Sequence, residues 1–160
     1  MKDLDEFDFD GLVEFRKTRR QRTVSYLKNK GFDARLDLLS ESVNLYAINI
    51  YFNTITSYSI GLVSETEVDL LCCLSVPLAD VDISTLLAHK LMDDIDYLKV
   101  YVTYSSELKS HAINFRVFLG EYDDNHIVSG VEILSHSIER YLKEVKEIWH
   151  MGRDEILDTD

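Results

Sequence analysis

Apolar residues recur at alternating steps of four and three between residues 125 and 150. The recurring positions are Ile127, Val131, Leu134, Ile138, Tyr141, Val145 and Ile148. This spacing places them on one face of an α-helix. Val128, Leu142 and Trp149 widen that face beyond the narrow seam of a two-stranded coiled coil. The pattern therefore predicts a long helix that lies flat on a sheet.

Both ends of this helix have suitable residues. Asp123, Asp124 and Asn125 can cap its N-terminus and place negative charge there, and Gly152 is placed to end it. Basic side chains that favour a helix C-terminus are Lys146, His150 and Arg153. The outer face is expected to hold three pairs of opposite charge four residues apart, which are Glu139 with Lys143, Arg140 with Glu144, and Lys143 with Glu147.

Between residues 34 and 76 the period changes to two, which is typical of β-strands. The expected strands are residues 34–39, 43–52, 55–63 and 68–76. The short polar turns between them favour antiparallel hairpins. The second strand is apolar on both faces apart from Asn44 and Asn49, so we place it inside the sheet. The only proline, Pro77, ends the fourth strand.

Two further helices are expected, at residues 11–30 and 82–94. Gly31 is placed to stop the first, and Asp82 is expected to cap the second. The apolar contacts are Leu12, Phe15, Val24 and Leu27 in the first helix and Ile83, Leu86, Leu87 and Leu91 in the second. Residues 98–104 and 113–119 alternate apolar and polar side chains most regularly, which predicts a half-buried hairpin.

The predicted order of elements is α-β-β-β-α-β-β-α, with three or four strands before the second helix. This order defines an α+β fold, in which an antiparallel sheet of five or six strands packs against amphipathic helices and the C-terminal helix is long. A length of 160 residues suits one domain. We expect this domain at residues 11–150, with a flexible acidic leader at 1–10 and a flexible acidic tail at 151–160.

The chain is acidic, with a net charge of −12. Nucleic acids and anionic membrane surfaces would be repelled, so we expect neither as a partner. No run of apolar residues approaches the roughly 18 that a membrane span requires. Residues 1–10 lack both the basic start and apolar run of a secretory signal and the arginines of a transit peptide. The sequence therefore predicts a cytoplasmic protein.

One basic cluster stands out in this acidic chain, and it falls on the first helix. Its members are Arg16, Lys17, Arg19, Arg20 and Arg22. Like charges on one helix repel each other unless carboxylates approach them. The cluster is either a solvated face neutralised by the acidic leader or tail, or a docking patch for an acidic partner segment. Nucleic acid is the least favoured partner for it.

Cys72 and Cys73 are the only cysteines, and they are neighbours in a predicted strand. Adjacent side chains in a strand point to opposite faces, and a disulfide between them would strain the backbone. We therefore expect two reduced cysteines, with at least one in the core. The alternative, a vicinal redox or metal site, lacks further cysteines to complete a ligand set.

No residue pattern points to a reaction. The nucleophile pattern G-x-S-x-G is absent, and the six glycines form neither phosphate-binding motif. The five histidines show none of the spacings of metal sites. Asp93, Asp94 and Asp96 lie close together but lack the pattern of a calcium-binding loop. We predict a protein that is not an enzyme, with no catalytic residue, cofactor or metal.

The order of elements resembles the type III secretion chaperone-like fold, which is shared with the YbjN-type family of sensory transduction regulators. The resemblance covers residues 11–149 and rests on the strands within 43–76, the hairpin within 98–119 and the helix at 127–149. It implies a small cytosolic protein, often a homodimer, that binds an extended or partly unfolded polypeptide along its sheet or helix surface. A polypeptide client and a second copy of the chain are therefore the expected partners.

Binding of this kind needs a strand edge or an apolar groove, together with aromatic side chains that give contact area at small entropic cost. Five of the nine tyrosines lie in predicted strands, at Tyr46, Tyr51, Tyr58, Tyr101 and Tyr104. As candidate partner-binding residues we select Tyr58, Tyr101 and Tyr104 with Arg16, Arg19 and Arg20. The alternative for the tyrosines is ordinary sheet packing with the hydroxyl at the rim.

Two other functions stay open. An immunity or antitoxin-type inhibitor would use contiguous exposed carboxylates to block a basic toxin surface, and its binding would weaken with salt. A small-ligand-binding or enzymatic α+β domain would instead carry a cavity between sheet and helices. A cavity lined by Tyr101, Arg116 or His111 would favour this second alternative.

Overall fold

The computed structural model describes residues 9–42, 45–62, 64 and 66–157. Its elements follow the order α-β-β-β-β-α-β-β-α, which confirms the α+β class and places four strands before the second helix. Expectations for residues 1–8 of the predicted leader, for residues 43, 44, 63 and 65, and for residues 158–160 of the predicted tail lie outside the described residues. So do the side chains of Leu12, Ile148 and Trp149.

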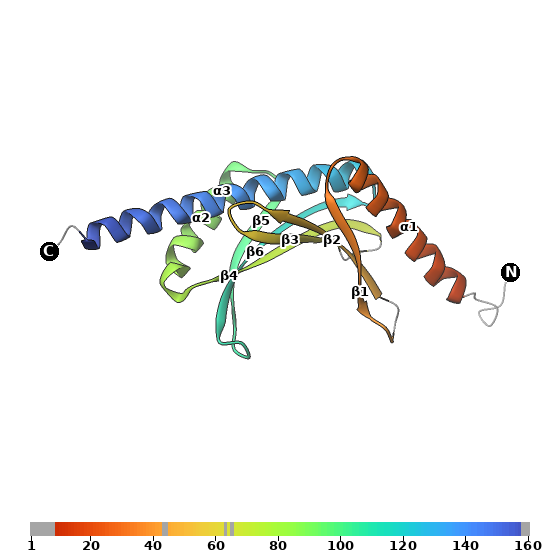
Figure 1. The fold of residues 1–160 in the computed structure, drawn as a ribbon, viewed down its shortest axis with the longest axis horizontal. Coiled ribbons are helices and arrows are strands. Elements are labelled where there is room, and N and C mark those ends of the chain that lie inside the picture. The colour runs from red at the N-terminus through yellow and green to blue at the C-terminus, as the bar shows by residue number, and fades with distance from the viewer. Residues whose placement is uncertain (1–8, 43–44, 63, 65, 158–160) are drawn as a thin grey trace.

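Three helices lie on one face of a six-stranded antiparallel sheet (Figure 1). The helices are α1 (Phe9–Asn29), α2 (Val81–Asp94) and α3 (Asp124–Leu157), and a short 3₁₀ helix, η2 (Leu78–Asp80), precedes α2. The strands are β1 (Asp33–Ser40), β2 (Leu45–Asn53), β3 (Ser57–Leu62), β4 (Glu67–Val76), β5 (Leu98–Ser105) and β6 (Ser110–Glu121). The strand order is β1-β2-β3-β4-β6-β5.

The core lies between this sheet and the helices. In β4, Val68, Leu70, Cys72 and Val76 are buried and Leu74 is half-buried, as the alternation along the strand predicts. The predicted stripe on α3 is buried at Ile127, Val131, Leu134, Ile138 and Tyr141. Both sets belong to one hydrophobic cluster, which confirms a long helix laid on a sheet.

The turn from α1 into β1 is fixed by a glycine. Gly31 has φ +94°, and its N–H donates to the carbonyl of Lys28 at 3.0 Å. The next N–H, of Phe32, donates to the carbonyl of Leu27 at 3.1 Å. These two bonds define a Schellman motif, in which glycine adopts the left-handed conformation without a Cβ clash. The predicted stop at Gly31 is confirmed.

Two residues expected in the core lie on the surface. Phe15 is 63% exposed, because it precedes the buried Val24 by nine residues, about half a turn away around the helix. Leu86 is 70% exposed, because α2 buries Ser84, Leu87, Ala88 and Leu91 instead. The N-terminus of α2 is also two residues earlier than expected: Asp80 occupies the cap position and Asp82 lies in the first turn.

The N-terminus of α3 agrees with the sequence, and its C-terminus does not. The Asp123 carboxylate accepts the N–H groups of Asn125 and His126 at 2.9 and 3.2 Å, which confirms the cap. The expected end at Gly152 is wrong, since the helix continues to Leu157. A glycine inside a helix costs only about 1 kcal/mol, and good helix formers follow it. The last turns of α3 extend beyond the sheet (Figure 1).

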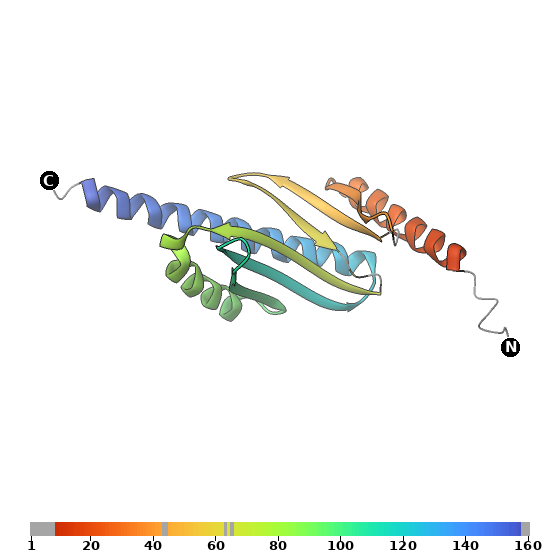
Figure 2. The same cartoon turned by 90° about the horizontal axis from the view of Figure 1, so that it is seen from below.

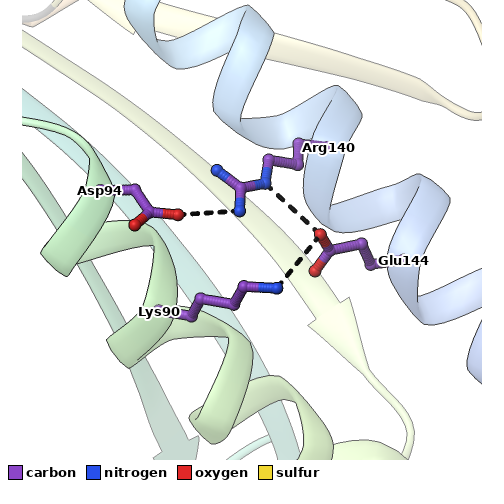
Figure 3. A network of polar contacts seen from close by, with 4 residues as sticks. All are labelled: Lys90, Asp94, Arg140 and Glu144. Atoms are coloured by element: carbon purple, nitrogen blue, oxygen red, sulfur yellow. Dashed lines mark hydrogen bonds and ion pairs between the residues drawn. The ribbon is translucent and has the colours of Figure 1, made fainter.

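An ion-pair network ties α2 to α3 (Figure 3). Arg140 donates to Asp94 at 2.8 Å and to Glu144 at 3.4 Å, and Lys90 lies 3.8 Å from Glu144. The predicted pair of Arg140 with Glu144 is therefore present. Each of these partly exposed pairs contributes at most about 1 kcal/mol to the stability of the fold. The network therefore orients α2 relative to α3 more than it stabilises their contact.

The six-stranded sheet divides between β3 and β4 into two three-stranded parts, β1-β2-β3 and β4-β6-β5 (Figure 2). Among the described residues, β3 and β4 pair at Gly61 with Leu71 and at Leu62 with Leu70. Helix α3 spans both parts, because it contacts β3 on one side and β4 and β6 on the other. Glu139 of α3, which was expected to pair with Lys143, instead accepts hydrogen bonds from Thr54 and Tyr58 of the β1-β2-β3 part.

Candidate functional site

The strand residues that alternate with the core residues form a face that the described helices leave uncovered (Figure 2). We call it the uncovered face. Its larger side chains are Arg35, Asp37, Asn49, Tyr51, Asp69, Leu71, Lys99, Tyr101, Asn114, Arg116 and Phe118. Between its two flanks lie small side chains, which are Ser57, Ser59, Gly61, Cys73, Ser75 and Ala112.

Arg116 forms the centre of one flank. Its guanidinium donates two hydrogen bonds to Asp69 across the β4–β6 pair, at 2.8 and 2.6 Å. This two-point contact raises the pKa of Arg116 above its usual value and fixes the guanidinium plane. The carboxylate of Asp69 is thereby neutralised locally, so this part of an acidic protein presents little free negative charge.

Three large apolar or aromatic side chains surround Arg116. Leu71 lies opposite it in β4, and Phe118 follows two residues later on the same face of β6. Tyr101 lies opposite Asn114 in β5, one diagonal step from Arg116. Leu71, Tyr101 and Phe118 are 37%, 43% and 48% exposed. We call these three residues the apolar patch.

The other flank carries a hydrogen-bonded group on β1 and β2. Asp37 accepts from the Asn49 amide at 2.6 Å and from the Tyr51 hydroxyl at 2.8 Å. The bond to Asp37 raises the pKa of Tyr51. Arg35 lies over the Tyr51 ring, 4.5 Å from its centre, and donates two bonds to Asp33. The carboxylates of this flank are therefore engaged as well.

The three tyrosines selected from the sequence lie in three different places. Tyr101 is on the uncovered face, whereas Tyr58 is buried beneath α3 and donates to Glu139 at 2.8 Å. Burial and this bond raise the pKa of Tyr58. Tyr104 lies on the helix side of the sheet near the hairpin end, with its ring 4.8 Å from that of His111. Only Tyr101 belongs to the apolar patch.

The selected arginines lie on α1, and their surroundings differ. Arg16 is exposed, whereas the guanidinium of Arg19 lies 4.0 Å from the centre of the Tyr122 ring. Arg20 is buried, at 4% exposure. The spacing of Arg20, Val24 and Leu27 on one helix face is the sequence signal that indicates this burial. Both interpretations of the basic cluster stay predictions.

The two cysteines lie on opposite sides of β4, as predicted. Cys72 is buried, Cys73 is exposed, and both are free. Burial raises the pKa of the Cys72 thiol to about 12, so its thiolate form is scarce at neutral pH.

We expect one thiol of the native protein to react quickly with a water-soluble disulfide reagent, since Cys73 is exposed and Cys72 is buried and protonated. The absorbance of the released thiolate at pH 8 measures this reaction. Denaturant should make the second thiol available, and Cys73→Ser should remove the fast phase. Two thiols reacting at the same rate in the native protein would contradict the assigned orientation of β4.

The structure also holds a cleft of about 560 Å³ near the end of the β5–β6 hairpin. Of the three residues proposed from the sequence to line a cavity, His111 lines this cleft, whereas Tyr101 and Arg116 lie on the uncovered face. The described residues bring together no three His, Cys, Asp or Glu side chains that could hold a metal ion.

No protein-family model, no curated protein and no solved structure matches this chain. Among the described helices, none combines the length and the apolar character that crossing a membrane requires.

Proposed function

We propose that this protein is a non-catalytic module that binds an extended polypeptide on the uncovered face, in the manner implied by the resemblance to type III secretion chaperones and YbjN-type regulators. The apolar patch around Arg116 is the observation that carries the proposal. The element order supports the resemblance, with one strand more than the order α-β-β-β-α-β-β-α. A homodimer in the cytoplasm belongs to the same proposal.

The apolar patch is unusual for its position. The solvated face of an antiparallel sheet normally carries polar side chains. Here Leu71, Tyr101 and Phe118 lie on that face, on three neighbouring strands around Arg116, with Lys99 opposite Arg116 in β5. Large exposed apolar side chains on a solvated sheet face favour an interaction site. An aromatic ring contributes contact area while immobilising few torsions, which suits the capture of a flexible chain.

The charges on the uncovered face favour apolar capture over electrostatic capture. Asp69 is paired with Arg116, and Asp37 accepts bonds from two neutral side chains. An inhibitor of a basic toxin would need contiguous carboxylates that are free to pair with the toxin. Binding to the uncovered face should therefore depend only weakly on salt, because apolar contacts are not screened.

We expect Phe118→Ala to weaken polypeptide binding by about tenfold or more, since aromatic residues at the centre of an interface often dominate its affinity. Phe15→Ala is the matched control, because Phe15 is also exposed but lies on α1. Each tagged variant would be incubated with native cell extract at about 50 mM and about 1 M NaCl, where screening differs strongly. Co-eluting polypeptides are identified and quantified by mass spectrometry.

The wild type and Phe15→Ala should retain the same polypeptide at both salt concentrations. Equal retention by Phe118→Ala would contradict the assignment of the site. A basic partner lost at high salt would support the inhibitor instead. Light scattering on the purified protein tests the homodimer, and a strict monomer that retains no polypeptide would overturn the proposal as a whole.

A further inference from the structure

The cleft near the β5–β6 hairpin has a floor made by three neighbouring strands. Val76 of β4 pairs with His111 of β6, and His111 pairs with Tyr104 of β5. These three side chains therefore stand in one row on the helix side of the sheet. Val76 is buried, and the Tyr104 ring lies against that of His111. Figure 1 shows the hairpin end, in teal, pointing away from the helices.

The chain segment between β4 and α2 provides an apolar wall. Pro77 and Leu78 line the cleft, and Leu78 is 79% exposed. The volume of about 560 Å³ falls within the range of ligand sites. A small ligand in a typical pocket is buried over most of its surface, but here the wall and Tyr104 stay largely open to solvent. A cleft that is open to solvent can bind the end of a longer molecule while the rest of that molecule stays outside it.

The charge lining the cleft is opposite to that of the whole protein. Among the described residues, its lining includes Lys109 and His111 but no carboxylate, although the chain carries a net charge of −12. Lys109 forms no ion pair with any described residue. Its backbone has φ +49°, a conformation that glycine or asparagine adopts more readily. A lysine held in this turn places an ammonium group at the cleft.

We propose that the cleft binds the C-terminal residue of a polypeptide. The terminal carboxylate would lie near Lys109 and His111, and an apolar last side chain would lie against Val76 and Leu78. Capture of a C-terminal carboxylate is a known mode of peptide recognition, and Lys109 is the positive side chain placed for it here. This inference rests on the proposed function, because it specifies which part of a polypeptide client the protein holds in addition to the segment on the uncovered face.

The probe is a fluorescein-labelled hexapeptide that ends in Leu-Phe with a free carboxylate, and fluorescence anisotropy measures its binding. We expect C-terminal amidation to weaken binding about tenfold or more, since a charge-assisted hydrogen bond is lost. Lys109→Gln should have a similar effect, whereas Lys143→Gln, an exposed lysine of α3 outside both the cleft and the uncovered face, should have none. Thermal unfolding of each variant checks that it folds.

A second matched pair tests the apolar wall. Leu78→Ser should weaken binding severalfold, while Leu86→Ser, a comparably exposed residue of α2 outside the cleft lining, should not. Equal binding of the acid and the amide would overturn the inference. So would N-acetylphenylalanine binding as tightly as the peptide, because the ligand would then be a small carboxylic acid. If Phe118→Ala weakens client capture as expected in either case, the proposed function stands without this inference.

Discussion

The Gly130→Val variant is expected to lose about 2 to 3 kcal/mol of unfolding free energy, because the side chain of residue 130 would enter space that the sheet already fills. A Cβ at Gly130 would lie 2.5 Å from Cδ1 of Leu70 and 3.4 Å from Cδ1 of Leu119. Leu70 is fully buried, so its movement is limited by the rest of the core. The two Cγ atoms of valine would crowd Leu70 and Leu119 further.

Two variants separate this packing effect from helix propensity. Ser129→Val places the same side chain on the neighbouring exposed position of α3, and it should change the free energy of unfolding by about 0.5 kcal/mol or less. Gly130→Ala gains about 1 kcal/mol of helix propensity, which offsets much of the cost of moving the Leu70 methyl group. Urea denaturation measures all three. Similar losses for the two valine variants would contradict the close approach of α3 to β4.

This close approach is one feature that hydrophobic periodicity does not reveal. The stripe from Ile127 to Tyr141 predicts which face of α3 meets the sheet, and the structure confirms it. The distance between helix and sheet depends on which strand residue lies below each helical residue. Gly130 meets Leu70, sixty positions earlier in the chain, and the sequence gives no signal for this pairing.

The uncovered face was partly predictable from strand alternation. Tyr58 alternates in phase with Ile60 and Leu62, so its burial follows from the period of two. Tyr101 and Phe118 share a phase with polar neighbours, which indicates a solvated face. The grouping of Leu71 with these two residues requires the order β4-β6-β5. That order depends on long-range pairing, which single-strand patterns do not contain.

The cleft also depends on long-range strand pairing that single-strand patterns do not contain. Its floor joins Val76, His111 and Tyr104, and two strand registers must be known before these residues become neighbours. The hairpin of β5 and β6 was predicted, and it accounts for one of the two registers. The pairing of β4 with β6 crosses α2, so no local turn fixes it. Sequence reasoning could propose His111 for a cavity but could not provide its partners.

The division of the sheet gives α3 a structural role that also serves the proposed site. The described residues of the two three-stranded parts pair at two positions, and α3 contacts both parts. Tyr58 anchors one part to Glu139, and Tyr141 of α3 lies against Phe115 of the other part. The opposite surfaces of the same strands form the uncovered face. Its two flanks therefore keep their spacing only while the packing beneath them is intact.

The Phe115→Ala variant is expected to lose about 4 kcal/mol of unfolding free energy, which is the typical cost of deleting a buried phenylalanine ring. Phe115 is fully buried in β6, between Cys72 of β4 and Val100 of β5. Its ring centre lies 5.5 Å from that of Tyr141, in an edge-to-face contact. Deletion would leave a cavity at the contact between α3 and the sheet, which relaxation of the surrounding structure fills only in part.

Phe118→Ala makes the identical deletion three residues later in the same strand, on the opposite face of the sheet. Because Phe118 is 48% exposed, its loss should change the free energy of unfolding by less than about 1 kcal/mol. Urea denaturation of the two variants therefore tests the orientation of β6, and the client-capture experiment on Phe118→Ala tests the function of its outer side. Equal destabilisation by the two substitutions would mean that both rings are buried. In that case another molecule would have to cover the uncovered face in the purified protein.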